Sequence, residues 1–240
     1  MKRFVTTIAA VFLISIALAQ KPMAECFTLE TQLNFQTGTA PVNIFTPNLR
    51  VRYFITDELA ARLQFAFLSE KSVITVTENA DGTGGDGSAT LSSSQFTFRP
   101  GIEKHFTGTN RLDPYIGAEI NIQIANAKET WDQADFDGFD YYYEEGTTLD
   151  LTGGWAFMDP TWSAGSTIGV NVLGGFDFYI TEHLYLGGEL GWGFYSFNGK
   201  DAEATEVFGG NTFTYISTGD NMSGFMMLPS GFVRIGWTVK

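Results

Sequence analysis

The chain has 240 residues, and its 27 Asp and Glu outnumber its 14 Lys and Arg, so the net charge is −13 at neutral pH. This acidic balance excludes nucleic acid as the expected partner, because binding to phosphates requires a basic face. Glycine (27 residues) and aromatic side chains (15%) are frequent. Such a composition favours a sheet protein with aromatic residues at an interface.

The first 19 residues have the pattern of a cleaved export signal. Lys2 and Arg3 precede an apolar run, and Ala17-Leu18-Ala19 has the small-x-small form of a cleavage site. The run is too short to anchor the chain in a bilayer core of about 30 Å. We therefore expect residues 1–19 to be removed and residues 20–240 to form one domain. Without Lys2 and Arg3, that domain has 12 basic and 27 acidic residues, and 12 − 27 gives −15.

Eight later segments alternate bulky apolar residues with small or polar ones, which is the period-2 signature of β-strands. In the last segment, Val233, Ile235 and Trp237 share one face, and Arg234 lies on the other. Pro100 lacks an N–H group, so we expect a bulge or local distortion in the fourth segment. The segments cover approximately residues 27–35, 44–55, 59–67, 94–106, 116–124, 168–180, 184–194 and 231–240.

The connections between these segments alternate in length. Those after the second, fourth and sixth segments are short, whereas those after the third, fifth and seventh are long. We expect residues 127–163 to be the longest irregular region and residues 198–223 to be an acidic loop, in which residues 212–216 could extend a hairpin. Short turns at one rim and long loops at the other are typical of an eight-stranded antiparallel up-and-down transmembrane β-barrel, with periplasmic turns and extracellular loops. A secreted β-sandwich would not need one bulky apolar face in all eight strands.

In this pattern, residues 27–240 resemble the small eight-stranded outer-membrane β-barrel family of the OmpA/OmpX-like transmembrane type. Gln20 after the cleavage site and the closing residues 232–237 are similar to barrels of the Bacteroidetes group. Such a resemblance implies residence in the outer membrane of a Gram-negative bacterium, with outer-membrane lipids, lipopolysaccharide and the barrel assembly machinery as partners. Members usually end in an aromatic residue, whereas this chain ends in Val239-Lys240. We expect a monomer.

Ten charged residues fall on the inward face of the segments. An eight-stranded barrel is just wide enough for side chains to fill its interior, and buried charges are tolerated there only when they are paired. Five acids against five arginines therefore predict a structural network that plugs the lumen, with an ion path as the alternative. The ten are Glu30, Arg50, Arg52, Arg62, Arg99, Glu103, Glu119, Asp177, Glu189 and Arg234.

Catalysis and metal binding have little support in the sequence. His105 and His183 are both expected at the periplasmic rim, away from the outer leaflet, so a lipid-modifying enzyme is a minor alternative. Asp135, Asp137 and Asp140 resemble the start of a calcium loop that lacks its completing glutamate, and a solvated acidic loop is the simpler interpretation. We predict no catalytic residue, metal or cofactor.

Aromatic residues accumulate in the longest predicted loop. They could form a recognition surface for an unknown extracellular ligand, because tyrosine and tryptophan are common binding anchors. They could equally form an interfacial girdle or the loop's own small core. The leading functional hypothesis is a structural or surface-interaction role, and a small pore or transporter with a hydrated lumen is the alternative. The residues are Trp131, Phe136, Phe139, Tyr141, Tyr142 and Tyr143.

Overall fold

The structure is a computed structural model, and it describes residues 21–33, 48–76, 87–132, 135–137, 140–142, 148–153, 164–208, 210–228 and 233–239. The predicted signal segment, residues 1–19, lies outside these ranges. Within them, no helix has the length and apolarity needed to cross a bilayer. The regular elements that the structure describes are β-strands.

Eight of these strands close into an antiparallel ring, which confirms the predicted fold class. Neighbours pair in the order β1-β2-β3-β4-β5-β9-β10-β14, and β14 returns to pair with β1. The strands are β1 (Phe27–Leu33), β2 (Leu49–Thr56), β3 (Leu59–Val76), β4 (Gly87–His105), β5 (Leu112–Asp132), β9 (Gly165–Tyr179), β10 (Leu184–Gly199) and β14 (Val233–Val239).

The closing strand pairs as its sequence predicts. All seven residues of β14 face β1, from Phe27 opposite Val239 to Leu33 opposite Val233. On its other edge, β14 pairs with the first part of β10, and β13 (Asn221–Leu228) pairs with the second part. The eighth position in the wall is thus shared by β13 and β14, so no edge is left open between β10 and β1 at the level of β14.

Short turns join β2 to β3, β4 to β5, and β9 to β10 at one rim of the ring, as predicted. In the first of these turns, a hydrogen bond from Lys104 lowers the pKa of the Glu58 carboxyl below its ordinary value. Pro100 has the expected local effect: Arg99 and Pro100 have no ladder partner on β5, although the pairs on either side keep one register. The register shift in this part of the wall lies instead between Phe54 and Thr56.

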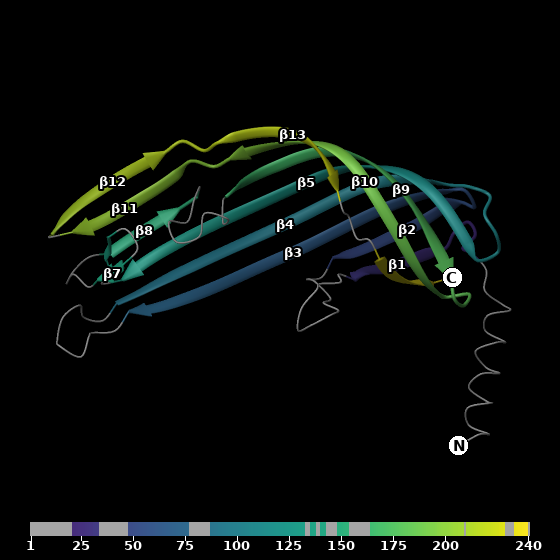
Figure 1. The fold of residues 1–240 in the computed structure, drawn as a ribbon, viewed down its shortest axis with the longest axis horizontal. Helices are drawn as coiled ribbons and strands as arrows, with labels where there is room; N and C mark the ends of the chain where they lie inside the picture. Colours follow the sequence, from purple (N-terminus) through teal and green to yellow (C-terminus); the bar gives the residue numbers. More distant parts are fainter. Residues whose placement is uncertain are drawn as a thin grey trace, which may run out of the picture.

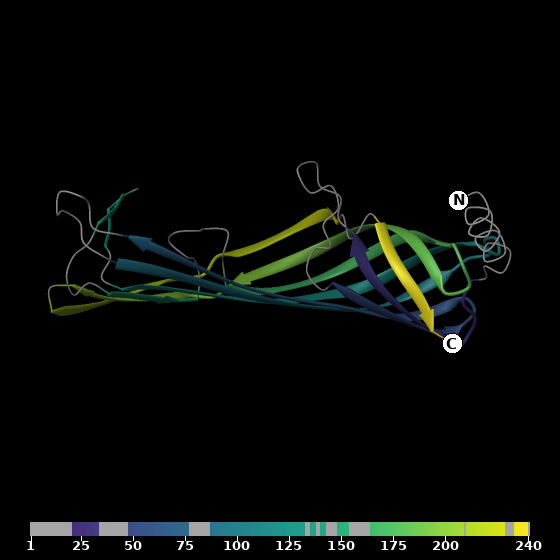
Figure 2. The same cartoon turned by 90° about the horizontal axis from the view of Figure 1, so that it is seen from below.

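At the opposite rim, three strands continue well beyond the ring (Figure 1). The lengths of β3, β4 and β5 are 18, 19 and 21 residues, whereas a strand needs about 9–11 residues to cross a bilayer. The end of β5 pairs with β8 (Thr148–Thr152), β8 with β11 (Ala202–Phe208), and β11 with β12 (Asn211–Ser217). We call the far ends of β3, β4 and β5 together with β8, β11 and β12 the outer sheet. Figure 2 shows this sheet edge-on as a thin layer that extends from the ring.

The outer sheet corrects the prediction for two loops. The described part of residues 127–163 is largely strand, because β5 extends to Asp132 and is followed by the short hairpin of β6 (Asp135–Asp137) and β7 (Asp140–Tyr142) and by β8. The predicted acidic loop, residues 198–223, contains β11 and β12 as a hairpin and the start of β13. The suggestion of a hairpin at residues 212–216 is confirmed.

The outward face of the ring is apolar up to one level and polar beyond it. Phe67, Phe96 and Ile124 are paired across β3, β4 and β5, and each is about half exposed. Two residues further along each strand, the outward positions are Ser69, Ser94 and Asn126, which are again paired. This change marks the outer limit of the band that faces lipid. On β9 and β10, apolar Ile168 and Phe194 are likewise followed by Ser166 and Ser196.

The inner face changes in the opposite sense at the same level. Inside the ring it is polar and charged, whereas in the outer sheet the buried residues on the same face are mainly small or apolar, with Glu129 as a buried acid among them. The small and apolar residues give the outer sheet one buried apolar face and leave its other face to water, as in an antiparallel sheet of a soluble protein. These residues are Ala89, Leu91, Ala127, Trp131, Leu151 and Ala204.

Candidate functional site

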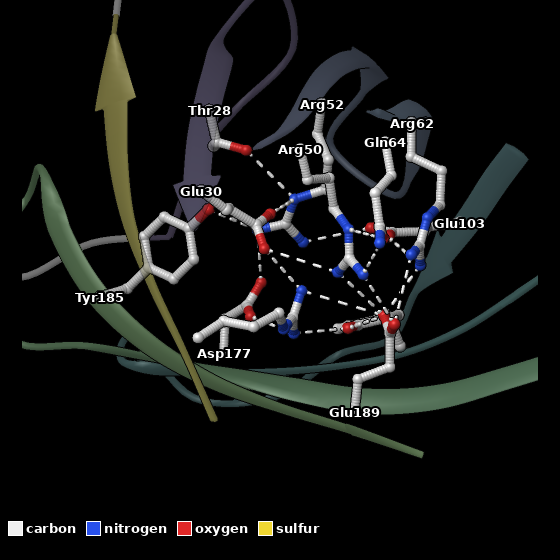
Figure 3. Close-up of polar contacts among 12 residues, drawn as sticks. Thr28, Glu30, Arg50, Arg52, Arg62, Gln64, Glu103, Asp177, Tyr185 and Glu189 are labelled. Atoms are coloured by element: carbon white, nitrogen blue, oxygen red, sulfur yellow. Dashed lines mark hydrogen bonds and ion pairs between the residues drawn. The ribbon is translucent and has the colours of Figure 1, made fainter. Parts of the chain in front are cut away.

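The charged side chains of the ring meet inside it because alternate residues of every strand point inward. Register then sets their height: Arg50 lies opposite Glu30 of β1 and Gln64 of β3, and Arg52 lies opposite Arg62. Two arginines on directly opposed positions would repel each other unless carboxylates separated them. Carboxylates from β1, β4, β9 and β10 reach into this space (Figure 3).

Arg52 is at the centre of the network and has no exposed surface. Its guanidinium nitrogens lie 2.5 Å from Glu30, 3.1 Å from Glu103 and 2.7 Å from Asp177. It also donates a hydrogen bond of 2.9 Å to the Tyr185 hydroxyl. A planar guanidinium can satisfy several oxygens at once, which is why arginine suits a buried position with so many acceptors.

Arg234, from the closing strand, repeats this arrangement beside Arg52. It lies 2.7 Å from Glu30 and 3.0 Å from Asp177, and it donates a hydrogen bond of 2.6 Å to the Tyr115 hydroxyl. Asp177 is therefore shared between two arginines, and Glu30 between three, since Arg50 also lies 3.5 Å from it. A shared carboxylate ties β14 to both β1 and β9, so the network connects strands that are not adjacent in the wall.

Arg62 and Arg50 form the next layer toward the outer sheet. Arg62 lies 2.9 Å from Glu103, 2.8 Å from Glu189 and 3.0 Å from Glu119. Arg50 makes a forked contact to the two Glu189 oxygens, at 3.1 and 2.9 Å. With these contacts, nine of the ten predicted residues are joined at 3.2 Å or less. We call these nine the charge plug: Glu30, Arg50, Arg52, Arg62, Glu103, Glu119, Asp177, Glu189 and Arg234.

Two tyrosines fill the space between the charges and the wall. Tyr115 lies opposite Gly175, and Tyr185 lies opposite Gly236 on the neighbouring strand. A Cβ atom at Gly175 would be 2.5 Å from the Tyr115 hydroxyl, and one at Gly236 would be 2.1 Å from the Tyr185 ring. Glycine is therefore required at both positions, because only glycine lets the tyrosine side chain lie against the adjacent backbone. In this position the two tyrosine hydroxyls point at the plug, and the Tyr115 hydroxyl donates a hydrogen bond of 2.6 Å to Glu189.

Sequence reasoning missed an extension of the network toward the turn end of the barrel. His105, expected at the rim, is buried with its ring nitrogens 3.0 Å from Asp113 and 3.2 Å from Glu103. Asp113 in turn faces Lys21 at 3.9 Å. The signal that could have found these residues is parity: His105 is two residues after Glu103, and Asp113 is two before Tyr115, so all four point inward.

Arg99 is the one predicted member that stands apart. Its only carboxylate neighbour within the described chain is Glu119, at 4.0 Å, and its Nε donates a 2.7 Å hydrogen bond to Asn121. About a fifth of its side chain (18%) is exposed, compared with 6% or less for the other four arginines. It lies above the plug, where a cavity of about 140 Å³ opens next to it.

Both histidines are held by oxygen acceptors of the barrel, and His183 also lies 3.4 Å from Glu182. The imidazole of His105 faces two carboxylates, and that of His183 faces the Thr238 carbonyl at 3.0 Å and stacks on Trp237. In the part of the chain that the structure describes, no serine, threonine or cysteine side chain hydrogen-bonds to either ring. Within the described residues, no group of three or more His, Cys, Asp or Glu side chains is arranged to hold a metal ion.

The residues proposed as a loop recognition surface are placed only in part. Trp131, at the end of β5, is buried on the inner face of the outer sheet, and its indole N–H donates a hydrogen bond to Glu129. Phe136 of β6 lies opposite Tyr141 of β7 in backbone register, and Tyr142 lies opposite Asp135. Phe139 and Tyr143 lie outside the described residues.

Comparison with known proteins gives a family match and distant structural likeness. The model of the OmpA-OmpF-like porin family matches residues 43–209, which is more than half of the chain. Among solved structures, the outer membrane protein OprG from Pseudomonas aeruginosa is 14% identical, with a TM-score of 0.37, over 92% of this chain and 99% of that one. No curated protein matches the chain.

Proposed function

The chain belongs to the OmpA-OmpF-like porin family of outer-membrane β-barrels, and from this premise we propose that it acts through the outer sheet, by surface interaction, with a lumen that is closed. The observation that carries the proposal is the exposed edge strand β12. The charge plug supports the closed lumen, because its contacts argue against the alternative of a hydrated pore.

The plug has a member on every strand of the ring, from Glu30 on β1 to Arg234 on β14. Its charges contact each other directly at hydrogen-bond distance, so they leave little width for water. A cavity beside Glu30, Arg50 and Arg234 has a volume of about 10 Å³, which is room for about one water molecule. An ion would have to break several buried pairs to pass, and each broken pair costs about 3–5 kcal/mol.

β12 has the features of an edge that accepts another strand. All seven of its residues are exposed, including Phe213, Tyr215 and Ile216. It pairs with β11 on one side, and among the described residues no strand pairs with its other side. An exposed edge presents unpaired N–H and C=O groups to which an extended peptide can add. Natural edges are usually protected by lysine or proline, whereas β12 contains no charged residue and no proline.

The charge around this edge favours a basic partner. Glu203 and Glu206 of β11 lie opposite Ile216 and Phe213, and Asp201 and Asp220 flank the hairpin. The whole chain carries a net charge of −13, so a second copy would be repelled. We therefore propose that the partner presents an extended, positively charged segment, which adds to β12 through main-chain hydrogen bonds and places basic side chains near these carboxylates.

Binding of defined peptides to the purified protein in detergent tests this proposal. The probe is an eight-residue peptide of alternating lysine and valine, and its control alternates lysine and proline, which has the same charge but cannot add to a strand. We expect fluorescence anisotropy to detect the lysine–valine peptide only. Substituting Ile216→Lys should weaken binding at least tenfold, whereas Ile216→Glu, which removes the same apolar side chain, should not.

A variant without β11 and β12 completes the test. Asn198 of β10 pairs with Asn221 of β13, so deletion of residues 200–219 leaves Gly199 and Asp220 as a two-residue hairpin turn. Equal binding of the lysine–valine peptide to this deletion variant, or of the lysine–proline peptide to the intact protein, would contradict strand addition at β12. Reproducible single-channel openings in planar bilayers would contradict the closed lumen, and turnover of lipid by the purified protein would support an enzyme instead.

A further inference from the structure

We propose that the outer end of the lumen contains a binding site for a small organic carboxylate, with Arg99 as its charged ligand. The site is the cavity of about 140 Å³ above the charge plug. Arg99, Asn121, Gln123, Thr167, Asn171 and Tyr195 line it. The proposal concerns the inside of the barrel and does not depend on the edge strand β12.

Arg99 has unused hydrogen-bonding capacity that faces this cavity. Its Nε is occupied by Asn121, but its two terminal amino groups have no hydrogen bond within the described chain. The nearest carboxylate, Glu119, is 4.0 Å away and is already bound by Arg62 at 3.0 Å and by Asn171 at 3.0 Å. Arg50, by comparison, is bound to both oxygens of Glu189. Arg99 is therefore the arginine of the lumen that can accept a further anion.

The other groups that line the cavity are neutral, and several of them can donate hydrogen bonds. Asn121, Gln123, Asn171 and Thr167 provide amides and a hydroxyl, and no acidic side chain lines the cavity. An arginine is permanently charged, and its planar fork matches the two oxygens of a carboxylate. In a chain with a net charge of −13, a cavity with one guanidinium and no acid attracts an anion rather than a cation.

The size of the cavity limits the ligand to a few heavy atoms. Its volume of about 140 Å³ suits a carboxylate in the size range of acetate to butyrate. The plug closes the lumen below Arg99, because Arg62 and Glu119 lie between the cavity and the turn end. A ligand therefore enters from the side of the outer sheet.

Titration of the protein in detergent with sodium acetate tests the proposal, with acetamide as the neutral molecule of the same shape. The measurement is the NMR shift of the Arg99 Nε–H and of the Asn121 and Asn171 side-chain amides. We expect acetate to move these signals in a saturable way and acetamide to leave them in place. Replacing Gln123 with Glu introduces a carboxylate that competes for Arg99, so Gln123→Glu should weaken acetate binding at least tenfold.

Arg99→Gln should abolish the saturable shifts at the Asn121 and Asn171 amides. An equal response to acetate and acetamide, or unchanged acetate affinity in Arg99→Gln, would overturn the proposal. If Arg99→Gln fails to fold, Gln123→Glu still decides the question, since unchanged acetate affinity in that variant would also overturn it. Lys104→Gln, which removes a basic residue at the turn rim far from this cavity, is the control that should keep acetate affinity unchanged.

Discussion

The ring and the outer sheet are built partly from the same three strands, yet their side-chain patterns are inverted. In β5, the outward residues Ile120, Ile122 and Ile124 face lipid, and the inward ones include Glu119 and Asn121. Beyond Ile124 the alternation continues, but the inward residues are apolar except for Glu129, and the outward residues are polar. One part of this continuous strand therefore has its outward face in lipid, and the other part has its outward face in water.

The inversion follows from what surrounds each part. In the bilayer, the outward face must be apolar, because lipid cannot hydrogen-bond to polar side chains. In water the same face must be polar, and stability comes from burial of the inner face. The two parts consequently differ in what holds them together. Paired charges fill the ring, whereas apolar side chains such as Leu91, Trp131 and Leu151 fill the inner face of the outer sheet.

The strongest test of this difference is to remove one strand element from each part. Deletion of Ser230–Lys240 removes β14, which pairs with both β1 and β10, and also removes Arg234 from the plug. We expect complete loss of membrane assembly, because an open sheet leaves unpaired backbone groups in lipid. The measurement is recovery of folded, protease-resistant protein from outer-membrane fractions.

Deletion of residues 200–219 is the matched removal from the outer sheet. It takes away β11 and β12 and the hydrogen bonds of Lys200 to Ala164 and Asn126, but it keeps the pairing of the ring strands, since β10 and β13 remain paired up to Asn198 and Asn221. We expect this variant to assemble at the level of the intact protein. Assembly of the β14 deletion, or failure of the 200–219 deletion, would show that the two parts do not fold as separable units.

The next largest effect is expected from a single arginine of the plug. Arg62 has no exposed side-chain surface and contacts Glu103, Glu119 and Glu189. Arg62→Ala leaves these carboxylates short of a partner in a buried site, so the free energy of unfolding should fall by about 3 kcal/mol or more. Reversible urea unfolding in lipid vesicles, followed by tryptophan fluorescence, measures the change.

Arg99→Ala is the control, because Arg99 is partly exposed and its nearest carboxylate is 4.0 Å away. Glu119 keeps its bonds to Arg62 and Asn171 when Arg99 is removed, so the loss should be smaller than for Arg62→Ala. Equal losses for Arg62→Ala and Arg99→Ala would show that burial of the pair does not determine its importance. An unchanged unfolding midpoint for Arg62→Ala would remove the argument for a structural plug.

Much of the ring could be predicted from the sequence, because a strand that faces lipid has a strict pattern. Alternation fixed the inward side of Glu30, Arg62 and Arg234, and the lengths of the connections separated the two rims. Which arginine meets which carboxylate could not be predicted, since that depends on the stagger between strands. Pairwise reading of the strands gives no reason to expect that Arg52 shares Glu30 and Asp177 with Arg234, or Glu103 with Arg62.

The outer sheet could not be predicted by the same rule. The pattern of outward apolar residues ends near Phe67, Phe96 and Ile124, so it predicts loops for the strand residues beyond them. His105 was missed for a related reason: its position in the chain suggested the rim, whereas its parity with Glu103 places it inside. Alternation with the apolar residues on either the outward or the inward face predicts the ends of β4 and β5 as strands.

The smallest expected effect concerns the core of the outer sheet. Trp131 donates a hydrogen bond to Glu129, which has no exposed surface. Trp131→Phe keeps an aromatic ring but removes the donor, and hydrogen bonds to charged groups contribute about 1.5–3 kcal/mol. We expect a local loss of about 2 kcal/mol, measured by amide hydrogen exchange at residues 128–132 of β5 and at β8, which pairs with them.

The same variant tests whether the loss of one hydrogen bond in the outer sheet changes amide exchange in the ring. Amides of the ring, such as those of residues 116–122, should exchange as slowly as in the intact protein, because their stability comes from the wall ladders and the plug. Glu129→Gln retains an acceptor for the indole and should have a smaller effect than Trp131→Phe. Faster exchange throughout β5 in Trp131→Phe would show that the outer sheet stabilises the ring, so the two parts would form one cooperative unit despite their inverted side-chain patterns.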